Sequence, residues 1–90
     1  MKRSDIEAIC RCRQAEATRI FRAARAANDH DVWLAYGQIM GLWPIVARLT
    51  REMAAWRHTP HWEDEFRDTL RFRRRALARI HLLERVREGK

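Results

Sequence analysis

The sequence predicts an all-α protein in which three helices run up, down and up, with a long apolar helix at the centre. Three observations predict this fold. Apolar residues recur at three- and four-residue steps in three segments, no stretch alternates with a period of two, and turn-forming residues separate the segments. Ninety residues without repeats, linkers or low-complexity tracts make one domain, residues 1–90.

The first helix is expected over residues 5–27. Ser4 and Glu7 have the spacing of a capping box, in which each side chain bonds a free backbone N–H of the first turn. The apolar stripe that follows consists of Ile6, Ile9, Cys10, Ala17, Ile20, Phe21, Ala24 and Ala27. The residues "NDHD" at 28–31 end this helix and cap the next, because Asn and Asp prefer helix boundaries to interiors.

The second helix is expected over residues 31–57, and it begins with sixteen uncharged residues from Val32 to Ala47. On a helical wheel its apolar side chains cover an arc of about 260°, against about 120° for each of the other two helices. A central helix with two apolar flanks is covered on both sides by its neighbours. The run is shorter than the roughly 20 apolar residues that cross a bilayer, so no membrane span is expected.

Pro44 interrupts this second segment. It removes one backbone hydrogen bond and disfavours helical geometry at Trp43, so the helix is expected to kink or break near 43–44, and a kink is the preferred interpretation. Gly37 and Gly41 fall on the thin polar side of the helix. Either the glycines are tolerated because no other part of the chain packs on this side of the helix, or they allow a second copy or a partner to approach it closely. A chain of this length also favours a homo-oligomer.

The third helix is expected over residues 60–87. Thr59 is the predicted N-cap and Pro60 the first helical residue, followed by acidic residues at 63–65 near the positive end of the helix dipole. The apolar stripe of this helix contains Trp62, Phe66, Leu70, Leu77 and Ile80.

The charge pattern points to an acidic partner. The net charge is +7, and it divides into +4 for residues 1–28 (seven basic, three acidic), 0 for 29–58 (three, three) and +3 for 59–90 (nine, six). The stretch "RFRRRALAR" at 71–79 is the strongest signal, although Asp64 and Asp68 on the same side partly offset it. These observations predict a nucleic-acid-binding or regulatory protein that contacts phosphates through Arg67, Arg71, Arg74, Arg75 and Arg79. Side by side, the two outer helices would form one basic surface.

The alternative interpretation is a protein-interaction module that docks on a larger acidic protein. Trp33, Trp56 and Trp62 are then candidate anchors, because Trp and Arg dominate binding hot spots, although ordinary core packing is the preferred explanation for them. Two arginines lie at the centres of apolar stripes and need partners. Arg13 is expected to pair with Glu52, and Arg73 is expected to reach solvent or point at a partner.

Signatures of an enzyme are nearly absent, so no catalytic residue, metal or cofactor is expected. Ser4 is the only serine, and there is no glycine-rich loop. The "HTPH" residues His58 and His61 are interpreted as exposed turn residues rather than metal ligands. Cys10 and Cys12 point about 200° apart on a helix and cannot pair with each other. Two free thiols and the lack of an apolar leader predict a cytoplasmic protein.

Overall fold

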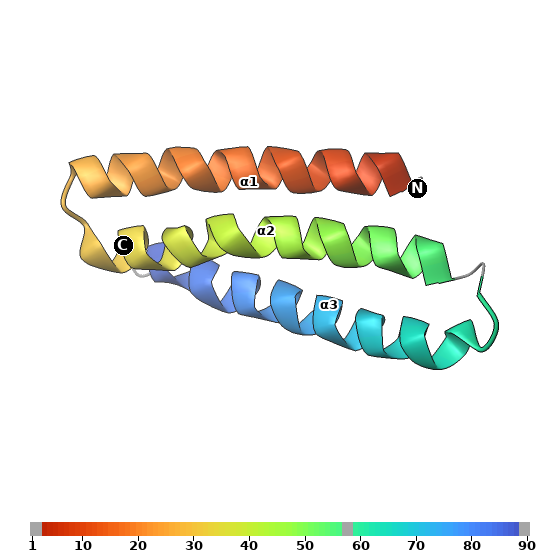
Figure 1. Ribbon diagram of the computed structural model, residues 1–90. Coiled ribbons are helices and arrows are strands. Elements are labelled where there is room, and N and C mark those ends of the chain that lie inside the picture. The colour runs from red at the N-terminus through yellow and green to blue at the C-terminus, as the bar shows by residue number, and fades with distance from the viewer. Residues whose placement is uncertain (1–2, 57–58, 89–90) are drawn as a thin grey trace.

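The computed structural model describes residues 3–56 and 59–88 and contains three long helices (Figure 1). They are α1 (Arg3–Ala26), α2 (His30–Trp56) and α3 (Trp62–Glu84), and a short 3-10 turn, η1 (Arg85–Arg87), follows α3. Consecutive helices run in opposite directions, and the Cα trace measures 51 × 20 × 17 Å. The described residues contain no strand, and the all-α, up-down-up prediction is confirmed.

The central helix holds the molecule together. Both α1 and α3 pack on α2, but no Cα atom of α1 lies within 8 Å of a Cα atom of α3, so the bundle is open on one side. The core residues of α2 are Val32, Ala35, Tyr36, Ile39, Val46 and Leu49. Cys10, Ala17 and Ala24 face them from α1, and Ala76 and Ile80 from α3. The wide apolar arc of α2 is therefore covered from two directions, as its helical wheel predicts.

The turn between α1 and α2 is built by the predicted "NDHD" residues. Asn28 adopts a left-handed conformation with φ 61°, which Asn tolerates better than most residues. Its N–H donates to the carbonyl of Arg25 at 3.2 Å, and the N–H of Asp29 donates to that of Ala24 at 2.9 Å. These two bonds form a Schellman motif that closes α1. The Asp29 carbonyl then accepts the Trp33 N–H at 2.9 Å, which starts α2.

The two predicted side-chain caps are wrong. The helix α1 begins at Arg3, so Ser4 lies inside it rather than before it. Thr59 closes α2 instead of opening α3, because its N–H and its hydroxyl both donate to the carbonyl of Trp56, at 3.0 and 2.8 Å. The residue before α3 is His61, which has φ 56° and makes no side-chain cap bond. The expected acidic first turn of α3 is present at residues 63–65.

Pro44 does not split the second segment. The helix α2 runs without interruption from His30 to Trp56, with Pro44 on its exposed side, so one long helix is present rather than two short ones (Figure 1). None of the described helices is long and apolar enough to cross a membrane.

Two contacts define how α1 and α2 are aligned. Glu7 forms an ion pair with Arg51 at 3.8 Å, and Phe21 packs beside Gly37. Phe21 lies fourteen residues after Glu7 and Gly37 lies fourteen before Arg51, so both contacts belong to one antiparallel register. A Cβ on Gly37 would lie 3.4 Å from the Phe21 ring, whereas a Cβ on Gly41 would meet nothing within 4 Å. The expectation that neither glycine packs within the chain therefore holds for Gly41 alone.

The different surroundings of the two glycines predict different effects of the same substitution. Gly37→Leu should lower the free energy of unfolding by about 1–3 kcal/mol, because the Cβ already touches the Phe21 ring and the atoms beyond it crowd that ring. Gly41→Leu should leave that free energy unchanged or raise it by up to about 1 kcal/mol, since Leu favours a helix over Gly. Urea denaturation followed by circular dichroism measures both. Equal destabilisation by the two substitutions would contradict the packing of Gly37 on Phe21.

Candidate functional site

The five arginines predicted to contact phosphates lie on the exposed side of α3. They are Arg67, Arg71, Arg74, Arg75 and Arg79, here called the arginine row. The row extends over thirteen residues, from Arg67 to Arg79, or about 18 Å at the rise of an α-helix. Only Arg79 has a polar partner in the described part of the chain, the Gln38 side-chain oxygen of α2 at 3.3 Å. The other four guanidinium groups form no ion pair with any described residue, so they are free to bind an external anion.

The arginine row is not joined by the basic residues of α1. Arg11, Arg22 and Arg25 are exposed, but α2 lies between the two outer helices (Figure 1). The guanidinium of Arg25 also lies over the Trp33 ring, 5.4 Å from its centroid. The single basic surface that the outer helices would form side by side is therefore absent. The charge is divided between two edges of the molecule.

The predicted ion pair of Arg13 with Glu52 is wrong. Arg13 pairs with Glu16 on its own helix at 3.8 Å, and Glu52 pairs with Arg48 at 3.7 Å. In the register defined by Glu7 and Arg51, Arg13 lies level with residue 45 and about 10 Å along the helix axis from Glu52. The Arg13 side chain is 57% exposed, so the charge needs no buried partner.

Arg73 finds its partner on α2. Its Nε donates to the Thr50 hydroxyl at 3.0 Å, and that hydroxyl donates to the Val46 carbonyl at 2.8 Å. The guanidinium is thus held at the α2–α3 contact, and the Arg73 side chain also lines the open side of the bundle. Sequence reasoning missed Thr50 because a threonine inside an apolar run carries no signal of its own.

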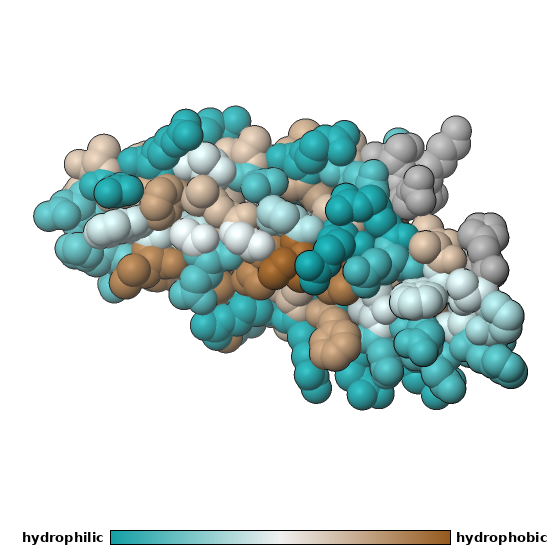
Figure 2. Space-filling view, in the orientation of Figure 1, coloured by the Kyte–Doolittle hydropathy of each residue, from teal (hydrophilic) through white to brown (hydrophobic). Residues whose placement is uncertain are grey.

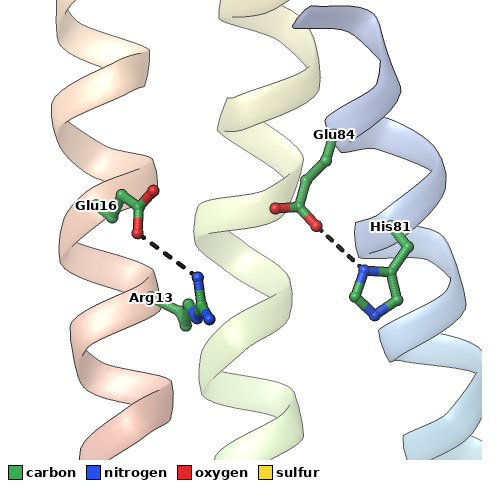
Figure 3. Close-up of polar contacts among 4 residues, drawn as sticks. All are labelled: Arg13, Glu16, His81 and Glu84. Atoms are coloured by element: carbon green, nitrogen blue, oxygen red, sulfur yellow. Dashed lines mark hydrogen bonds and ion pairs between the residues drawn. The ribbon is translucent and has the colours of Figure 1, made fainter. Parts of the chain in front are cut away.

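A groove of about 430 Å³ opens where α1 and α3 fail to meet. Its apolar lining consists of Ile6, Ile9 and Cys10 from α1, Trp43 and Val46 from α2, and Leu77 from α3. Arg13, Arg73, His81 and Glu84 supply the polar lining. In Figure 3, Arg13 and Glu84 reach from α1 and α3 over α2, and His81 Nδ1 lies 3.3 Å from the Glu84 carboxylate. The groove therefore offers an apolar floor between charged walls.

The three candidate tryptophan anchors are all half-buried. Trp33 packs against Phe21 and His30, with ring centroids 6.4 and 5.2 Å away. Trp62 packs edge-on against Phe66 at 5.4 Å, and Trp56 ends α2. The rings of Trp33 and Trp62 thus take part in packing within the chain, and the role of the three tryptophans as anchors stays a prediction. Of the two candidate glycines, only Gly41 is exposed.

The two cysteines have different surroundings. Cys12 is exposed, and Cys10 is buried at the floor of the groove. Burial raises the pKa of the Cys10 thiol, and this effect outweighs the nearby Arg73 guanidinium, which lowers it. The described residues contain no group of three His, Cys, Asp or Glu side chains that could hold a metal ion. Of the two histidines of the "HTPH" turn, His58 lies outside the described residues.

The difference between the two cysteines predicts selective thiol chemistry. An alkylating reagent at neutral pH should modify Cys12 rapidly and Cys10 slowly, because reaction requires an accessible thiolate and the raised pKa of Cys10 disfavours that form. In a Cys12→Ser variant the remaining thiol should react only as the protein unfolds. Mass spectrometry of timed samples measures both rates. Equal rates for the two thiols in the native protein would contradict the burial of Cys10.

The fold and the site define a class of protein: a small, basic, all-helical protein with an open three-helix arrangement and an edge of exposed arginines. Comparison with protein-family models, with curated proteins and with solved structures gives no match.

Proposed function

We propose that this chain is a non-enzymatic nucleic-acid-binding protein that contacts the phosphate backbone through the arginine row of α3. Guanidinium groups bind phosphate oxygens through two parallel hydrogen bonds, and the planar fork suits that geometry better than an ammonium group does. Contacts of this kind supply affinity and position a protein, but they do not read a base sequence.

One observation carries the proposal: four adjacent guanidinium groups of α3 are exposed and have no carboxylate partner among the described residues. The acidic side chains with defined ion pairs are engaged elsewhere, as in the pairs of Glu7 with Arg51 and Glu16 with Arg13. Asp64 and Asp68 are exposed on the same helix but form no ion pair with the arginine row. Positive charge along this edge is therefore available to a polyanion.

The salt dependence of binding tests the proposal. Five phosphate contacts predict a log–log slope of about −4.5 on duplex DNA, which corresponds to a loss of affinity of about 500-fold between 50 and 200 mM salt. Fluorescence anisotropy with labelled duplex and single-stranded oligonucleotides of DNA and RNA measures the slope. Absence of binding to all of them at about 50 mM salt, where charge-driven binding should be readily detected, would refute the proposal.

The alternative is a protein-interaction module, and the groove is the observation that favours it. An apolar floor lined by Trp43, Val46 and Leu77 is available to an amphipathic segment of an acidic partner, with Arg13 and Arg73 beside it. Such binding depends on apolar burial and should persist in about 0.5 M salt, where phosphate contacts are screened. A nuclease-treated pull-down washed at that salt distinguishes the two functions.

The free thiols support a reducing compartment for either function. An exposed cysteine such as Cys12 is open to oxidation, and a reducing cytoplasm protects it. We therefore place the protein in the cytoplasm as part of the same proposal.

A further inference from the structure

An exposed aromatic ring lies on the same helix as the arginine row. Phe72 of α3 is 55% exposed, whereas the other two phenylalanines, Phe21 and Phe66, are half-buried. Those two rings pack against Trp33 and Trp62, and no aromatic ring of the described residues stacks on Phe72. The Phe72 ring is therefore accessible to a flat group of an external ligand.

Helical geometry places this ring at the edge of the arginine row that borders α2. Arg75, three residues after Phe72, is its neighbour on the helix surface. Arg79, seven residues after Phe72, lies within about 20° of it around the helix, and its guanidinium bonds the Gln38 side chain of α2 at 3.3 Å. Figure 2 shows this border, where hydrophobic atoms lie along α2 and hydrophilic atoms cover most of α3. The ring and the row thus belong to one surface.

The charge of this surface favours a polyanion that runs along α3. Residues 67–79 contain six arginines and one acidic residue, Asp68. Four members of the row follow one another at four-residue steps: Arg67, Arg71, Arg75 and Arg79. Each step is about 6 Å along the helix. A strand lying along this line meets one guanidinium after another, as in protein grooves that follow the backbone of single strands.

The aromatic ring distinguishes a single strand from a duplex. In a duplex each base is stacked between its neighbours, so the faces of the bases are covered. In a single strand the bases can turn outward and stack on an aromatic side chain. Gln38 adds a polar group beside the ring, because its side-chain oxygen accepts the Arg79 bond and its amide nitrogen can still donate. This surface therefore suits unpaired bases as well as phosphates.

We propose that the arginine row binds single-stranded nucleic acid, with the phosphates along the row and an unpaired base stacked on the Phe72 ring. This inference rests on the proposed function and specifies the form of its ligand. Stacking uses the face of a base, which every base of DNA and RNA has. The site therefore binds single strands of either kind with little preference for sequence.

Fluorescence anisotropy of the full chain tests the inference with labelled oligonucleotides of about 15 nucleotides. The ligands are a thymidine strand, a uridine strand and a mixed-sequence DNA duplex. At about 150 mM salt, where charge alone binds a duplex weakly, both single strands should bind more tightly than the duplex. Phe72→Leu should weaken binding of the single strands about 5- to 150-fold, which is the contribution of one stacked base, and should leave binding of the duplex unchanged.

The salt dependence separates stacking from charge. Phe72→Leu removes no phosphate contact, so the log–log slope on a single strand should keep its wild-type value, about −3.5 for five contacts. Phe72→Trp should retain the wild-type affinity, because Trp supplies an aromatic face at the same position. The helical circular dichroism spectrum should be unchanged in Phe72→Leu, since the side chain is exposed and Leu favours a helix.

The matched control is Ile9→Ala. Ile9 is 42% exposed, but it lines the groove between α1 and α3, so this variant should bind single strands like the wild type. Equal affinity for single strands and duplex, or single-strand binding that Phe72→Leu leaves unchanged, would overturn the inference while the proposed function stands. Absence of binding to every oligonucleotide at about 50 mM salt would refute both.

Discussion

Replacing Ile80 with Ala should lower the free energy of unfolding by about 2–5 kcal/mol. Ile80 is fully buried, with 0% of its surface exposed, and lies where α3 packs on α2. The loss is large because only α2 packs closely on α3, since no Cα atom of α1 lies within 8 Å of a Cα atom of α3. This loss is a substantial part of the total free energy of unfolding, which is roughly 5–13 kcal/mol for a chain of ninety residues.

Leu82→Ala is the matched control for this substitution. Leu82 lies two residues away on the same helix but is 53% exposed, so its truncation should cost less than about 0.5 kcal/mol. Urea denaturation at a fixed protein concentration measures both variants. With a slope of about 1–3 kcal/mol per molar urea, the midpoint should fall by about 0.7 M or more for Ile80→Ala alone. Equal shifts would contradict the packing of α3 on α2 through Ile80.

Replacing Arg71, Arg74 and Arg75 together with Gln should weaken nucleic-acid binding strongly and change its salt dependence. Each lost phosphate contact reduces the log–log slope by about 0.9, so the slope should become shallower by about 2.7. All three side chains are exposed, and none forms an ion pair with a described residue, so the fold should be unaffected. Gln has a helix propensity similar to that of Arg, which keeps α3 intact.

The control for this triple variant is the replacement of Arg11, Arg19 and Arg22 with Gln. These residues are exposed on α1, and their loss changes the net charge by the same amount. If the arginine row of α3 binds phosphates, this second variant should keep nearly the wild-type slope, because α2 separates the two edges. Anisotropy titrations at several salt concentrations measure both slopes. Equal effects of the two triple variants would show that net charge, not the arginine row, drives binding.

The sequence by itself was enough to determine the local features of this protein. Periodicity predicted three helices close to their observed bounds, with residues 31–57 expected for the second and His30–Trp56 found. The wide apolar arc of that helix predicted its central place between two neighbours. The "NDHD" turn and the exposure of the arginine row also follow from residue types and helical spacing. All of these depend on positions a few residues apart, where the geometry of one helix relates them.

Only the tertiary structure decided how the helices are aligned and how far apart they lie. In the observed register of α1 on α2, Glu7 lies beside Arg51, and Arg13 is too far along the helix to reach Glu52 as predicted. The gap between α1 and α3 divided the basic charge between two edges and opened the groove. Packing also placed Phe21 on Gly37 and Thr50 beside Arg73. Helical periodicity identifies which side of a helix is apolar, but neither the axial offset of two helices nor the angle between them is encoded in that pattern. Those quantities depend on how side chains from different helices fit together.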